Sequence, residues 1–112
     1  MREIVIPILN DEYKVIVCFG THDKISKVLK SWGHQPEDTK SSLIGNRGTC
    51  FYSEGKHPVI ALPHKPKTAT EIGTLAHEAC HAIEDIFNKI SQPPSGELFA
   101  HSVGAVVRSV LK

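Results

Sequence analysis

The sequence has few cysteines, and their positions exclude the common structures built from cysteine. Cys18, Cys50 and Cys80 are an odd number of thiols, without the spacing of a disulfide framework or of a Cys-x-x-Cys zinc ribbon. We therefore expect free thiols in a reducing compartment, and hence a cytoplasmic protein.

A strong net charge and a long apolar run are also missing. The formal net charge is only +1, which gives no reason to expect nucleic acid or an anionic membrane surface as a partner. No segment approaches the roughly 18 apolar residues of a membrane span. The first residues, Met1 to Glu12, contain Pro7 and lack a small-residue cleavage site, so we expect neither a signal peptide nor a membrane partner.

The 112 residues have the ordinary apolar and charged fractions of a globular protein, 40% and 22%. This length suits one domain, residues 1–112, with a modest core that needs no structural metal. Four runs are typical of β-strands: Glu3–Leu9, Tyr13–Phe19, Thr49–Tyr52 and Val59–Leu62. A turn at Asn10–Glu12 separates the first two runs, and a helix is predicted from Gly20 to Gly33. Residues 34–48 are mostly loop by composition.

Thr68 begins the clearest element of the sequence. Thr68 and Glu71 fit a capping box. An unbroken helical pattern of apolar residues follows: Ile72, Leu75, Ala76, Ala79, Cys80, Ile83, Ile86, Phe87 and Ile90. In this pattern Cys80 is expected to point into the core as a small hydrophobe. Pro93 and Pro94 must end the helix, and Ser95 can cap a last one.

These elements predict an α+β domain with a small mixed or antiparallel sheet. The sheet is expected to pack on an N-terminal helix, on the long helix after Thr68 and on a C-terminal helix. The apolar stripe of the C-terminal helix is Phe99, Val103, Val106, Val107 and Val110.

The long helix carries the motif His77-Glu78-Ala79-Cys80-His81. Two histidines four residues apart lie on one face, about one turn from each other, and can bind one ion. Zinc suits imidazole ligands and accepts a tetrahedral site with one open position. Glu78 can then act as the general base that takes a proton from water and delivers it to the leaving amine. The alternative is a pair of solvated helix histidines beside a surface glutamate.

A catalytic zinc site needs a third protein ligand. Asp85 is unsuitable, because ligands on three successive turns of a straight helix would span roughly 12 Å. The metzincin extension is excluded, since positions 84 and 87 hold Glu84 and Phe87 instead of glycine and histidine. Glu97, in the first turn of the last helix, is the best candidate, and His101 is the rival. The alternative for Glu97 is a carboxylate favoured by the helix dipole.

Together, His77 to Asp85 and the downstream Glu97-Leu98-Phe99-Ala100-His101 resemble the gluzincins. The likeness is to minimal members related to ImmA/IrrE-type and other phage- or prophage-associated peptidases, and it covers roughly Ala69 to Val107. It implies a zincin-like domain with one Zn²⁺, held by His77, His81 and Glu97, with Glu78 as the base. It also implies that a protein or peptide substrate binds along an edge strand by strand addition.

Two further residues are candidates for the chemistry. In many gluzincins the position of His101 is an aspartate that orients a ligand histidine. His101 could therefore support a ligand, stabilise the transition state, bind metal or simply be solvated. The segment Thr49–Tyr52 is the candidate edge strand, and Tyr52 could donate to the oxyanion. The alternative is a tyrosine that packs half-buried in the strand.

Three functions are compatible with these residues. The first is a zinc peptidase that acts on a protein partner. The second is a catalytically silent zinc-binding module that uses the edge strand for protein interaction. The third is a DNA-associated protease of the SprT kind, which is disfavoured because the chain has no Cys-x-x-Cys ribbon and no basic tract. The sequence leaves the substrate and the oligomeric state open.

Overall fold

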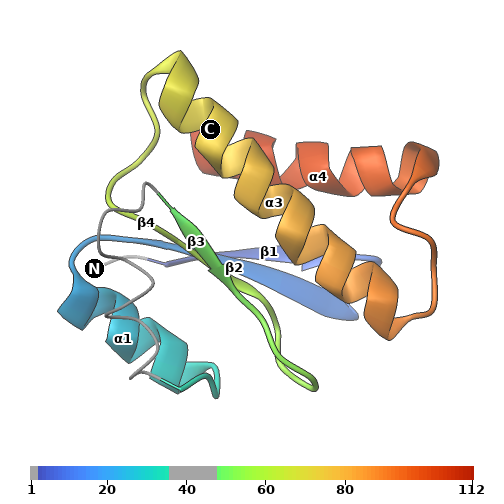
Figure 1. The fold of residues 1–112 in the computed structure, drawn as a ribbon, viewed down its shortest axis with the longest axis horizontal. Coiled ribbons are helices and arrows are strands. Elements are labelled where there is room, and N and C mark those ends of the chain that lie inside the picture. The colour runs from blue at the N-terminus through green and yellow to red at the C-terminus, as the bar shows by residue number, and fades with distance from the viewer. Residues whose placement is uncertain (1–2, 36–47) are drawn as a thin grey trace.

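The computed structural model describes residues 3–35 and 48–112, and it has an α+β fold (Figure 1). Most of the segment predicted to be loop, residues 34–48, lies outside the described residues. The described elements are, in order, β1 (Glu3–Ile8), β2 (Tyr13–Phe19), α1 (His22–Ser31), β3 (Thr49–Phe51), β4 (Val59–Leu62), α3 (Ala69–Lys89) and α4 (Gly96–Leu111). Among these residues, no helix has both the length and the apolar character needed to cross a membrane.

The four strands form one mixed sheet in the order β1-β2-β4-β3. β1 and β2 make the predicted antiparallel hairpin, with Ile8 opposite Tyr13. The central pair β2 and β4 is parallel, whereas β3 pairs antiparallel with β4 and forms an edge of the sheet. β1 ends one residue earlier than predicted, because Leu9 has a φ of 56° and cannot continue an extended strand.

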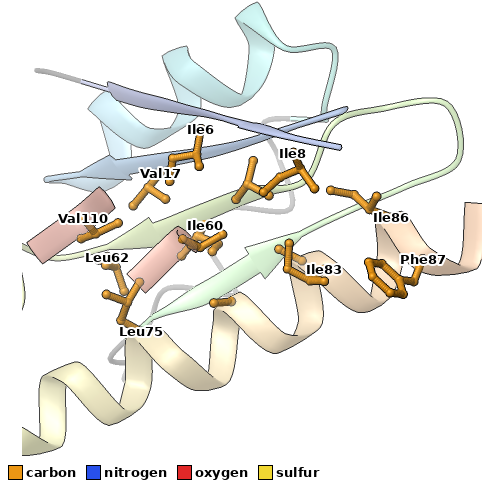
Figure 2. Close-up of a cluster of buried hydrophobic side chains, with 14 residues drawn as sticks. Ile6, Ile8, Val17, Ile60, Leu62, Leu75, Ile83, Ile86, Phe87 and Val110 are labelled. Atoms are coloured by element: carbon orange, nitrogen blue, oxygen red, sulfur yellow. The ribbon is translucent and has the colours of Figure 1, made fainter. Parts of the chain in front are cut away.

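Each face of the sheet has its own hydrophobic cluster, as the two-residue period of the strands requires. On one face, Ile16, Cys18, Val59 and Ala61 pack against α1. On the other face, Ile6, Ile8, Val15, Val17, Ile60 and Leu62 pack against α3 and α4 (Figure 2). The predicted mixed sheet with helices on its faces is therefore confirmed at the level of an α+β fold.

Both ends of α3 are defined by capping interactions. At the N-terminus, Thr68 accepts a hydrogen bond from the Glu71 amide at 3.2 Å, and the Glu71 carboxylate accepts one from the Thr68 amide at 3.2 Å. This confirms the predicted capping box. At the C-terminus, Ser91 has a φ of 58°, and the Gln92 amide donates to the Phe87 carbonyl at 2.9 Å. The helix thus ends in a Schellman motif before it reaches the prolines.

α4 packs against α3 through its apolar stripe. The rings of Phe87 and Phe99 meet edge to face, with their centroids 5.4 Å apart. Val106 and Val110 are buried in the same cluster as Leu75 of α3, so the two helices cover one face of the sheet together.

The capping box makes the stability of the fold depend on pH. Hydrogen bonds from Lys67, His64 and Thr68 lower the pKa of Glu71 from 4.5 to about 2. A carboxylate with a lowered pKa stabilises the folded state above its unfolded pKa, and that contribution disappears as the pH falls toward the folded pKa. Between pH 4.5 and about 2, the free energy of unfolding should therefore fall less steeply in Glu71→Gln than in the wild type.

Urea denaturation at several pH values measures these slopes. Thr68→Ala is the control, because it removes the other half of the box without removing a titrating group. It should lower the free energy of unfolding by about 1 kcal/mol and leave the pH slope as in the wild type. Equal slopes in Glu71→Gln and the wild type would contradict the role of Glu71.

Candidate active site

The two histidines of the motif lie together on the solvent side of α3. Their Nε2 atoms are 3.2 Å apart, and the rings are nearly perpendicular, with centroids 4.7 Å apart. Two nitrogens bound tetrahedrally to one zinc ion at 2.0–2.1 Å would be separated by about 3.3 Å. The separation of the two Nε2 atoms is therefore close to that of two ligands of one zinc ion. The same separation also allows one neutral ring to donate an N–H to the other.

Glu78 lies beside this pair, between it and the edge strand. The backbone N–H of Cys50 in β3 donates a hydrogen bond to the Glu78 carboxylate. Burial raises the pKa of Glu78, while His77, His81 and the Cys50 hydrogen bond act against that rise. The carboxylate is thus half-buried and lies next to the backbone of β3.

The predicted third ligand is not beside the two histidines. The side chains of Glu97 and His101 are 94% and 75% exposed, and their nearest polar atoms are 3.8 Å apart. Glu97 lies two residues before Phe99, and so about 200° around α4 from the face that packs on α3. Within the described residues, no three His, Cys, Asp or Glu side chains are grouped so that they could hold a metal ion.

The remaining sequence predictions have different outcomes. β3 is an edge strand in contact with α3, as expected for the candidate substrate-binding strand. Tyr52 follows β3 directly and is 53% exposed. All three cysteines are free thiols, as predicted, but the prediction that Cys80 points into the core is wrong because it is exposed. The buried face of α3 includes Ala79, and the next residue is turned about 100° away from it.

Sequence reasoning missed the polar contacts that join α3 to the β3–β4 hairpin. Asp85 and Lys89 form an ion pair at 2.7 Å, and Lys89 also donates to the backbone carbonyl of Lys56 in the turn between β3 and β4. With Glu78, these residues recur at i, i+7 and i+11 on one side of the helix. That spacing is visible in the sequence as a polar stripe. The contacts of Glu78 and Lys89 with the hairpin are to backbone groups, which the sequence cannot identify.

Gly48 allows β3 to approach α3 closely. A Cβ added there would lie 2.7 Å from the Leu62 Cδ2 atom and 3.1 Å from the Thr74 Cγ2 atom. Leu62 is buried in the core and has little room to move. The residue just before β3 is therefore at a position that favours glycine.

We expect Gly48→Ala to lower the free energy of unfolding by about 1–3 kcal/mol through overpacking. Gly73→Ala is the matched control, because a Cβ at that position in α3 would meet open space among the described residues. It should raise the free energy of unfolding by about 0.5–1 kcal/mol through the better helix propensity of alanine. Chemical denaturation measures both changes, and a neutral Gly48→Ala would contradict the close packing.

The likeness to gluzincins depends on the motif from His77 to His81 and on the downstream Glu97. No model of a known protein family, no curated protein and no solved structure matches the chain.

Proposed function

We propose that this protein is a zinc-dependent peptidase of the minimal gluzincin type, with a zincin-like domain. The observation that carries the proposal is the 3.2 Å separation of the His77 and His81 Nε2 atoms, close to the about 3.3 Å expected for two ligands of one tetrahedral zinc ion. Zinc, when bound, would supply a Lewis acid for the attacking water and the scissile carbonyl.

The position of Glu78 supports its role as the general base. Its carboxylate adjoins the histidine pair and the Cys50 N–H. It would accept the proton of the attacking water and pass it to the nitrogen of the leaving amine. A protein or peptide substrate would bind in extended form at the edge strand β3, with Tyr52 as a candidate donor to the oxyanion.

Glu97 remains the proposed third ligand, with His101 as the rival. For Glu97 to reach the pair, α4 would have to turn by roughly half a revolution about its axis, since its apolar stripe packs on α3. The exposure of Glu97 favours a second candidate function, a zinc-binding module that engages proteins through β3 without cleaving them.

Glu78→Gln separates these two functions. We expect this variant to keep bound zinc, measured by elemental analysis, and to lose about 10²- to 10⁴-fold in cleavage rate on a quenched fluorescent peptide library. Glu84→Gln is the matched control, because Glu84 is an exposed glutamate on the same helix. It should cleave as the wild type does.

Zinc content also tests the ligands. His77→Ala and His81→Ala should each lose zinc, and zinc retention in both would contradict the site. Loss of zinc in Glu97→Ala would support Glu97 as the third ligand, whereas loss only in His101→Ala would assign that role to His101. A wild type that binds zinc but cleaves no peptide of the library would favour the binding module.

A further inference from the structure

The turn between β3 and β4 is attached to α3 by one lysine. The Lys89 ammonium donates to the Asp85 carboxylate at 2.7 Å and to the backbone carbonyl of Lys56. The side chains of Lys89 and Asp85 are only 20% and 13% exposed. A charge with so little access to water needs such partners, so this contact is more constrained than an ordinary surface ion pair.

The same turn is held from the other side by two histidines. The Lys14 amide donates to the His57 Nδ1 atom at 3.3 Å, and the His34 Nε2 atom lies 2.7 Å from the His57 carbonyl. The His57 ring also meets Trp32 edge to face, with centroids 5.9 Å apart. Because residues 56 and 57 are adjacent, the end of the hairpin is fixed both to α3 and to the β2–α1 side of the molecule.

The turn between β3 and β4 and the strand β3 itself contact the same side of α3, at Lys89 and at Glu78. β3 runs beside α3 (Figure 1), and the two elements are in contact. The Cys50 N–H of β3 lies beside Glu78 and partly offsets the rise that burial causes in its pKa. Lys89, eleven residues and about 16 Å further along the helix, donates to the turn. Burial is the main cause that raises the pKa of the Cys50 thiol. Glu78 and Asp85 raise it further and Lys89 lowers it, so Cys50 lies within the electrostatic reach of all three groups.

We propose that Lys89 is a positioning residue: with Asp85 it joins the β3–β4 turn to α3 and so holds the edge of β3 in place against Glu78. The inference rests on the proposed peptidase function for its meaning, but the contact itself does not depend on zinc or substrate. The role accounts for a charged side chain at a mostly buried position. An ammonium group has three donors, and two of them serve Asp85 and Lys56.

The Cys50 amide is the direct reporter of this role. We expect Lys89→Met to speed hydrogen exchange of the Cys50 amide by about 10- to 100-fold relative to the wild type, the range for loss of a hydrogen bond to a charged group. Exchange is read residue by residue by NMR on the full chain. Lys89→Arg should restore most of the protection, since arginine can reach the same acceptors.

Lys65→Met is the matched control. Lys65 also donates to a distant backbone carbonyl, that of Lys112, at 2.9 Å. A lysine with only a general stabilising role would behave like Lys65, whose loss should leave the Cys50 amide unchanged. If Lys89→Met does not fold, as judged by circular dichroism, Asp85→Asn keeps the lysine and should give a smaller increase in the same exchange rate.

The inference would be overturned if Lys89→Met folds and its Cys50 amide exchanges as in the wild type. If Lys89→Met does not fold, an unchanged exchange rate in Asp85→Asn would overturn it. Peptide cleavage is a separate measurement. Lys89→Met should keep its zinc and cleave the peptide library more slowly than Lys65→Met. Equal rates in these two variants would overturn the link to the site. If the wild type cleaves nothing, the proposed function fails, while the exchange measurement still decides whether Lys89 positions β3.

Discussion

The packing of α3 on one face of the sheet determines where His77, Glu78 and His81 lie. Leu75, Ile83 and Ile86 lie on the side of the helix that faces the sheet and are fully buried. His77 lies two residues after Leu75 and is therefore turned about 200° away, toward solvent. Glu78, a further 100° around, falls at the boundary where α3 meets β3. The order of buried, boundary and exposed positions on one helix thus separates the core from Glu78 and Glu78 from the histidines.

Most of the fold could be predicted because its signals are local. The capping box at Thr68, the period-two strands and the turn at Asn10 each need only a few neighbouring residues. The errors occur at element ends. β1 stops at Ile8 and β3 at Phe51, because a strand end depends on a partner strand or on one backbone angle. Propensity carries little information about either.

The candidate site divides in the same way. The histidine pair is specified by a spacing of four within one helix, so the sequence could predict its geometry. The third ligand depends on how α4 is rotated against α3, which is a tertiary property. Glu97 and His101 do not belong to the apolar stripe of α4, and the apolar stripe is the side that packs on α3. The contact of Glu78 with a backbone N–H is invisible in a sequence, because every residue but proline has one.

The parallel pairing of β2 with β4 has a consequence for the order in which the molecule assembles. Ile16 pairs with Val59, so a long loop must close before the centre of the sheet exists, and such closure slows folding. The helix around His77 and His81 needs only local contacts and can form on a much shorter timescale. We expect the histidine pair to exist early as a nascent feature of α3. The partnership of Glu78 with β3 joins residues far apart in the sequence, so it forms only once α3 has packed against the sheet.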